Sequence, residues 1–140
     1  MLIPDFTRYS LALLEGDTLI YSAGGGGLRP LWEALEKVKG KSGLILHDKV
    51  MGLAAARLVV HSAAIAEIFT GVVSLPAKQF LENNGIALTA FDVVSNILTK
   101  DKSVVCPGEV IALDTSDPNA FLEKIKAMMD KSDGRATLVN

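Results

Sequence analysis

The sequence predicts a single α/β domain in which helices pack on both faces of a mixed central sheet that begins with a β-hairpin. The length of 140 residues fits one domain, and a hydrophobic fraction of 49% suffices for a core without a metal or a disulfide. A hairpin pattern opens the chain, and strand and helix patterns then alternate. Such alternation is typical of a sheet with helices packed against it.

The hairpin is predicted from two short apolar-rich runs, residues 8–14 and 18–23, which the Glu-Gly-Asp turn at 15–17 separates. The first run is also compatible with a helical turn. Four glycines at 24–27 then interrupt the chain. A proline followed by apolar residues at helical spacing predicts a helix over residues 30–39.

Residues 43–47 predict a short strand, after which Asp48 is placed to cap a helix that runs to about His61. Lys49 and Arg57 are the only Lys, Arg, Asp or Glu residues inside that helix. A helix with so little polar surface must be covered on more than one side, by the sheet and by another helix or a partner subunit.

Residues 67–73 predict a buried strand. Ser74 and the Leu-Pro pair that follows it predict the start of a helix. Asn84, which precedes a glycine, predicts the end of that helix. Residues 86–91 predict the next strand. This strand, helix and strand form the second unit in which a helix connects two strands of the sheet.

The C-terminal third has a mixed pattern. Residues 95–98 and 109–113 have helical patterns, whereas residues 100–103 resemble a loop. Asp117 caps the last helix, and a loose tail is expected from about residue 130 onward. One apolar stripe marks the buried side of that helix: Phe121, Leu122, Ile125, Met128 and Met129.

The charge balance excludes several classes of function. Lys and Arg number 14 against 16 Asp and Glu, so no basic stripe is present to bind phosphates, and nucleic acid is not expected as a partner. The single cysteine, Cys106, cannot form an internal disulfide, and the first residues do not resemble a signal peptide, so we expect a cytoplasmic protein. No membrane span is expected, because charged side chains divide the most apolar region: Asp48, Lys49, Arg57, Glu67 and Lys78.

Four motifs suggest a family: residues 48–56 (DKVMGLAAA), 71–77 (GVVSLPA), 83–86 (NNGI) and 106–109 (CPGE). A chain with these motifs resembles an uncharacterised bacterial and archaeal family of zinc-less proteins, known as a domain of unknown function. The resemblance implies a cytidine deaminase-like fold with three layers. This sequence departs from the family at Leu53, where a lysine is expected, so a role resting on that lysine does not carry over.

The same resemblance implies that the zinc site is absent. Zinc deaminases carry His-x-Glu at the start of one helix and Pro-Cys-x-x-Cys at the start of the next. At the first helix start the corresponding residues are Asp48 and Val50, and at the second they are Pro76, Ala77 and Phe80. The sulfur ligands and the proton-shuttling glutamate are missing. We therefore expect no metal, no cofactor and no zinc-dependent deamination.

A ligand site is predicted at the start of the helix after Asp48, where the resemblance places the substrate pocket. His47, Asp48 and Lys49 would line it, although Asp48 has an alternative interpretation as an ordinary N-cap. Arg29 and the glycines at 24–27 could present a guanidinium and backbone N–H groups to an anion. The alternative is that these glycines form a flexible connection.

Cys106 and Glu109 are the candidate catalytic residues. Pro107 favours a helix start directly after Cys106, and a thiol at a helix N-terminus is more acidic and more nucleophilic than usual. Glu109 could act as a general base or cap the same turn. The alternative is a buried, inert cysteine, since no histidine partner is evident.

Three functions from different classes follow. The first is a non-catalytic pseudoenzyme that binds a small nucleotide-like or anionic molecule. The second is a zinc-independent enzyme that uses Cys106, Glu109 and Asp48, and the third is a protein-interaction or oligomerisation module. We expect a homo-oligomer, because the helix after Asp48 offers few polar residues to solvent.

Overall fold

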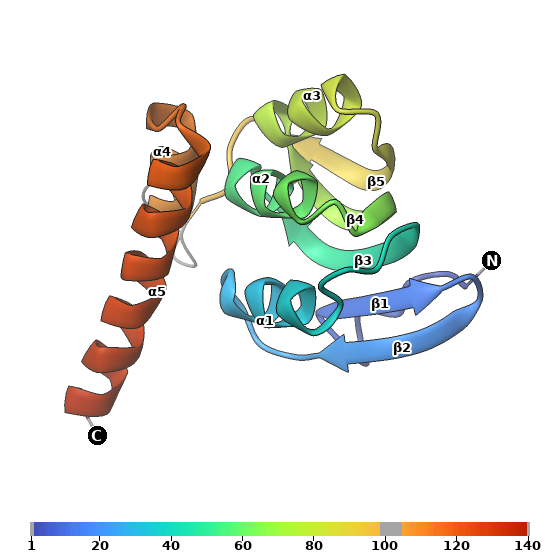
Figure 1. Ribbon diagram of the computed structural model, residues 1–140, viewed down its shortest axis with the longest axis horizontal. Helices are drawn as coiled ribbons and strands as arrows, with labels where there is room; N and C mark the ends of the chain where they lie inside the picture. The colour runs from blue at the N-terminus through green and yellow to red at the C-terminus, as the bar shows by residue number, and fades with distance from the viewer. Residues whose placement is uncertain (1, 99–104, 140) are drawn as a thin grey trace.

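The computed structural model describes residues 2–98 and 105–139, with side chains described as far as residue 131. It contains a five-stranded mixed sheet of order β2-β1-β3-β4-β5 (Figure 1). The hairpin strands and β1 with β3 pair antiparallel, whereas β3, β4 and β5 run parallel. The strands are β1 (Leu11–Glu15), β2 (Thr18–Ala23), β3 (Leu44–Met51), β4 (Ile65–Ser74) and β5 (Ala87–Val94).

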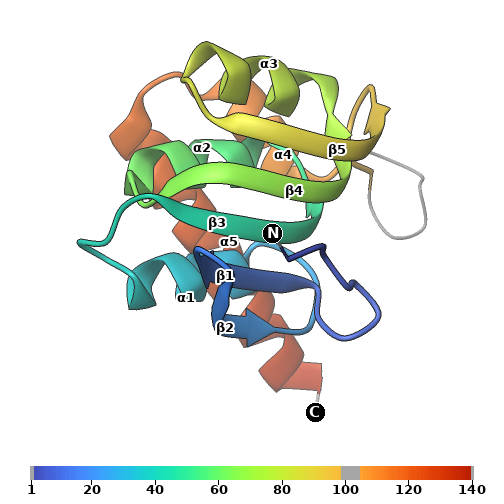
Figure 2. The same cartoon turned by 90° about the vertical axis from the view of Figure 1, so that its right-hand side faces the viewer.

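The described helices all lie on one side of the sheet, so the expectation of helices on both faces is wrong for this part of the chain (Figure 2). Consecutive parallel crossovers of the usual right-handed sense place α2 and α3 on the same face. The outer helices α4 and α5 form a further layer beyond α2 (Figure 1). The helices are α1 (Arg29–Lys37), α2 (Leu53–Ser62), α3 (Leu75–Asn83), α4 (Pro107–Asp114) and α5 (Pro118–Val139).

The prediction that the most apolar helix is covered on more than one side is confirmed. α2 lies between the sheet and α4, and its residues Ala54, Ala56 and Val59 are buried. α4 approaches closely because Gly108 faces it: a Cβ there would lie 3.7 Å from the Cβ of Ala54. The third layer therefore covers the side of α2 that faces away from the sheet, where the sequence predicts another helix or a partner subunit.

The predicted hairpin turn and the predicted starts of α3 and α5 are confirmed. Gly16 forms the turn between β1 and β2 with a φ of +60°, a conformation that favours glycine. Ser74 Oγ accepts a hydrogen bond from the N–H of Ala77 at 3.3 Å and so caps α3. Asp117 caps α5 in the same way through the N–H of Ala120, at 2.9 Å.

The prediction that Asp48 begins the second helix is wrong. β3 continues through Asp48 to Met51, and Gly52 is the N-cap of α2. Inter-strand hydrogen bonding decides this, because β1 pairs with β3 up to Leu11 opposite Asp48, and β4 pairs with β3 as far as Met51 opposite Val73. Pairing with β1 therefore keeps Asp48 in the sheet, and pairing with β4 extends β3 beyond the point where the local pattern places a cap.

The region after β5 also differs from expectation. Residues 95–98 are not helical, and Leu98 forms an isolated antiparallel bridge with Val105. The loop predicted at 100–103 lies outside the described residues. α5 runs on to Val139, across the stretch that we expected to be a loose tail. No helix in the described ranges is both long and apolar enough to cross a bilayer.

Candidate functional site

The first turns of α2 and α3 meet at one buried carboxyl group, that of Glu109 on α4. The side chain is 2% exposed. Its Oε1 accepts a hydrogen bond from the N–H of Ala54 at 3.2 Å, and its Oε2 accepts one from the hydroxyl of Ser74 at 3.3 Å. Glu109 thus joins the start of α2 to the cap of α3.

Gly52 makes this arrangement possible. Gly52 is the N-cap of α2 and has no side chain with which to satisfy the free N–H groups of the first turn. Glu109, which lies far along the sequence, supplies the missing acceptor. A Cβ at position 52 would lie only 2.8 Å from Cδ of Glu109 and 3.1 Å from Cγ1 of Ile97. Glycine is therefore required by space at this position.

The electrostatics of Glu109 combine two opposing effects. Burial raises the pKa of the Glu109 carboxyl, and hydrogen bonds from the N–H groups of Ala54 and Leu53 and from Ser74 partly offset that rise. The positive ends of two helix dipoles also favour a negative charge here. Both oxygens accept hydrogen bonds inside the protein and the residue is buried, so this group holds helices together and is shielded from an incoming substrate.

His47, predicted as a ligand residue, is buried in the sheet instead. It is 1% exposed, and Nδ1 is hydrogen-bonded to the Tyr9 hydroxyl at 2.8 Å. The rings of Tyr9 and Phe69 lie against the imidazole, with centroids at 6.1 and 5.6 Å. Nε2 has no hydrogen-bond partner among the described residues, and burial lowers the pKa of His47. The N-terminal segment therefore covers His47.

Asp48 and Lys49 follow on β3 and do not lie at a helix start. Although Asp48 keeps some exposed surface, burial of its carboxyl group raises the pKa to about 8, against smaller opposite effects of the Val50 and Lys49 N–H groups. The Lys49 side chain is exposed, and its N–H donates to the carbonyl of Ser10 at 2.9 Å. These two residues hold the strand in the sheet.

Arg29 and Cys106 also lie apart from the predicted site. Arg29 begins α1 and forms an ion pair with Asp130 of α5 at 3.9 Å. Cys106 is the N-cap of α4, and its carbonyl accepts the N–H of Glu109 at 2.9 Å. Cys106 and Glu109 share a helical turn, as the spacing predicts, but the Glu109 carboxyl is bound to α2 and α3.

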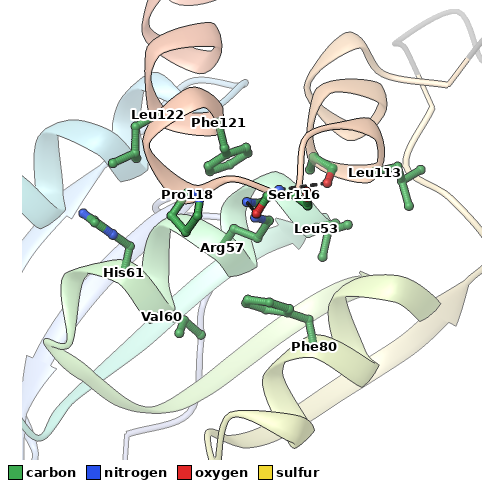
Figure 3. A pocket seen from close by; sticks show the side chains of 11 residues that line it. Leu53, Arg57, Val60, His61, Phe80, Leu113, Ser116, Pro118, Phe121 and Leu122 are labelled. Carbon is green, nitrogen blue, oxygen red and sulfur yellow. Dashed lines mark hydrogen bonds between the residues drawn. The ribbon is translucent and has the colours of Figure 1, made fainter.

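A groove that sequence reasoning missed runs over the outer surface of α2. It encloses about 460 Å³ between α3 on one side and α4 and α5 on the other (Figure 3). The available signal was the spacing of Leu53, Arg57, Val60 and His61, which places an arginine on one face of an otherwise apolar helix. The full lining is Leu53, Arg57, Val60, His61, Phe80, Ala112, Leu113, Ser116, Pro118, Phe121 and Leu122.

Arg57 is the polar centre of this groove. Its Nη1 donates to the carbonyl of Ala112 at 2.9 Å and to that of Thr115, and Nη2 donates to the carbonyl of Ser116 at 3.4 Å. The guanidinium carbon lies 4.0 Å from the ring centroid of Phe121, within cation–π range. Burial lowers the pKa of Arg57. Arginine nevertheless stays charged at neutral pH, so the groove contains a cation.

Fold and site together define an α/β protein with a one-sided mixed sheet, in which a buried carboxyl group joins two helix starts. Among the described residues no three His, Cys, Asp or Glu side chains are placed to hold a metal ion. The chain belongs to the domain-of-unknown-function family DUF1893, whose model matches residues 5–129.

A solved structure of a member of the same family is similar to this chain. The crystal structure of a DUF1893 family protein from Thermotoga maritima is 25% identical, covers 90% of this chain and 82% of its own, and superposes with a TM-score of 0.75. No curated protein matches the sequence. The chain therefore shares its family and its fold with this protein.

Proposed function

We propose that this protein is a non-catalytic small-molecule-binding protein, a pseudoenzyme on a cytidine deaminase-like fold that works in the cytoplasm. The hairpin followed by two parallel crossovers supports the deaminase-like part, because this is the order of elements that the family resemblance implies. The free thiol of Cys106 supports a reducing compartment.

The position of Glu109 carries the non-catalytic part. The space between the starts of α2 and α3 is where the resemblance puts reaction chemistry, and the chain's own carboxyl fills it. Cys106 lies within three residues of Glu109, but Glu109 is directed to Ala54 and Ser74, and neither histidine is hydrogen-bonded to the thiol in the described residues. The enzyme hypothesis therefore lacks an available base.

The groove over α2 supports the binding part. Its volume of about 460 Å³ is within the range of small-molecule sites, which are roughly 300–1,000 Å³. Such sites combine apolar walls with a few placed polar groups, as the aromatic side chains and Arg57 do here. We propose that the ligand lies in this groove rather than beside Asp48.

The test is a thermal-shift screen of nucleosides, nucleotides and small organic acids, paired with an ammonia-release assay on the same compounds. We expect at least one compound to stabilise the protein in a saturable manner. The substitutions Asp48→Ala and Lys49→Ala should leave that stabilisation unchanged. We expect no ammonia release above that of Glu109→Gln, which keeps the side-chain shape. Release by the wild type that Glu109→Gln abolishes would instead make the protein a zinc-independent enzyme.

We also propose self-association through β5. In the described part of the chain β5 has a strand neighbour on one side only, and it contains no Lys, Arg or Pro that would protect an edge. Phe91 and Val93 are 66% and 45% exposed on it. A second copy pairing antiparallel about residues 90 and 91 would set Thr89 opposite Asp92, so the only charge of each strand would face a hydroxyl.

A further inference from the structure

The groove over α2 contains a guanidinium whose hydrogen bonding is incomplete. Arg57 donates to three backbone carbonyls, through both N–H groups of Nη1 and one of Nη2. The N–H of Nε and the second N–H of Nη2 have no protein acceptor among the described residues. Arg57 is half-buried and its Nε is not among the buried atoms that lack a partner, so these donors are open to the groove and available to an acceptor from a ligand.

The charge of Arg57 is also unbalanced. In the described residues no carboxylate forms an ion pair with it, and the three groups that accept its hydrogen bonds are neutral carbonyls. Asp117, the acid next to the groove residue Pro118, caps α5. The other titratable group of the lining, His61, is exposed at the end of α2. The groove therefore has room for one negative charge close to the guanidinium.

The remaining surface of the groove is apolar. Phe80 extends from α3 toward Arg57, and Phe121 lies on the α5 side with its ring against the guanidinium (Figure 3). Phe121 is 2% exposed and forms part of the core, whereas Phe80 is only partly buried and offers a ring to a ligand. Leu113 is 51% exposed at the α4 edge. A flat or compact apolar body would cover these side chains.

From these features we propose that the groove is a binding site for a small organic monoanion: an apolar, preferably aromatic, body that packs on Phe80 and carries one carboxylate bound by Arg57. This names the ligand class of the site proposed above and rests on that proposal. A nucleotide is disfavoured, because its several phosphate charges would meet one fixed cation here. A free inorganic anion is disfavoured too, since it would leave Phe80 and Leu113 uncovered.

Two probes that differ in charge alone test this: 2-naphthoate and its neutral isostere 2-naphthamide, titrated calorimetrically into the full chain. We expect the wild type to bind the carboxylate at least about tenfold more tightly than the amide. Amide NMR shifts should map to α2 and to the turn of α3 that contains Phe80. Equal affinities, or shifts confined to another surface, would overturn the proposal without any variant.

Variants then separate charge from packing. Arg57→Gln should reduce the preference for the carboxylate to within about twofold, while Phe80→Ala should weaken both probes by similar factors. Lys78→Gln is the matched control, because Lys78 is a cation on α3 that pairs with Glu82 at 3.1 Å and does not line the groove. If Arg57→Gln does not fold, Arg57→Lys replaces it, with a reduced but remaining preference expected from a point charge that lacks the planar fork.

The outcomes distinguish this inference from the proposed function. Failure of both probes, with stabilisation by another compound in the screen, would overturn the ligand class and leave the binding function standing. Ammonia release that depends on Glu109 would overturn the non-catalytic function, whatever the probes show. A preference for carboxylate that survives Arg57→Gln places the anion elsewhere and contradicts the assignment. A dimer that Leu113→Lys dissociates, with no probe bound, would make the groove an interface between copies.

Discussion

Gly52 and Glu109 lie far apart in the sequence and depend on each other in space. The amide of Ala54, two residues after Gly52, is 55 residues from the carboxyl that accepts its hydrogen bond. The helix is capped by a side chain from another helix, because its own N-cap residue is a glycine with no side chain to do so. The absence of a side chain at position 52 is therefore as necessary as the carboxyl at 109.

Gly52→Ala should destabilise the fold by roughly 1–3 kcal/mol, because the new methyl group would overlap Glu109 Cδ and press on Ile97. Urea unfolding measures the loss. Gly26→Ala is the control, since a Cβ at that position meets nothing within 4 Å. Combining Gly52→Ala with Glu109→Ala should cost less than the sum of the two single changes, and strict additivity would contradict the clash.

Asp48 should make stability fall as pH rises. Its pKa is raised from 3.8 to about 8 in the folded chain, so folding retains a proton that the unfolded chain releases. The stabilisation is fully present below pH 3.8 and is lost as pH rises through about 8. The raised pKa of Glu109 acts in the same direction. The lowered pKa of His47 acts in the opposite direction, because the stabilisation from a neutral His47 is lost as the pH falls below 6.5.

Asp48→Asn should therefore flatten the dependence of unfolding free energy on pH between 3.8 and about 8, and the variant should exceed the wild type in stability at the upper end. Chemical unfolding at several pH values measures this. Glu33→Gln, an exposed change on α1 that also removes one carboxylate, is the control. An Asn variant that keeps the full wild-type slope would show that Asp48 does not hold the proton.

At the scale of elements, two sets of hydrogen bonds hold α4 against α2. Glu109 near the start of α4 binds the first turn of α2, and Arg57 in the second turn of α2 binds the carbonyls that end α4. Small residues at these two sets of hydrogen bonds, Gly108 beside Glu109 and Ala112 beside Arg57, let the helices approach. The outer side of α4 keeps Val110 and Leu113 exposed.

The two faces of α3 should respond differently to truncation. Leu81 is fully buried, so Leu81→Ala should cost roughly 2–5 kcal/mol. Phe80 is only partly buried, because it lines the groove, so Phe80→Ala should cost at most about half of the roughly 3–5 kcal/mol typical of a fully buried Phe. Urea unfolding of this adjacent pair is the measurement. If Phe80→Ala lowered the unfolding free energy as much as Leu81→Ala or more, the groove would be closed in solution.

At the scale of the whole molecule, the sheet has one covered face and two edges in the described chain. The helices take one face, and the N-terminal segment lies over part of the other (Figure 2). Tyr9 of that segment is hydrogen-bonded to His47. β2 and β5 end the sheet. β5 is the longer of the two and carries the more exposed aromatic side chain, Phe91.

Self-association should depend on the β5 edge. Light scattering across a wide concentration range should give a mass above that of one 14.9 kDa chain, and Phe91→Lys should return it to the monomer. Leu19→Lys on the opposite edge strand is the matched control, because Leu19 is 47% exposed on β2. A monomer mass at every concentration, or dissociation by the β2 change alone, would contradict pairing through β5.

Most of the element order was determined by the sequence, because it depends on local chemistry. Turn residues around Gly16, the Ser74 cap followed by Pro76, and Asp117 before Pro118 each act over a few residues, and the hairpin turn, α3 and α5 lie where these signals predict. The apolar character of α2 also predicted that it would be covered on two sides. Such signals decide the local structure where no long-range pairing competes with them.

Tertiary structure alone decided where β3 ends, which face the helices cover and what meets at the helix starts. Asp48 is a good local cap, but β1 pairs with it and β4 extends β3 past it, and pairing of that kind is invisible to short-range patterns. The candidate site followed the same rule. Glu109 and Gly52 come together only because α4 folds back over α2, and Arg57 acquires its groove from α3, α4 and α5, so the sequence contained these residues without the long-range packing that gives them a role.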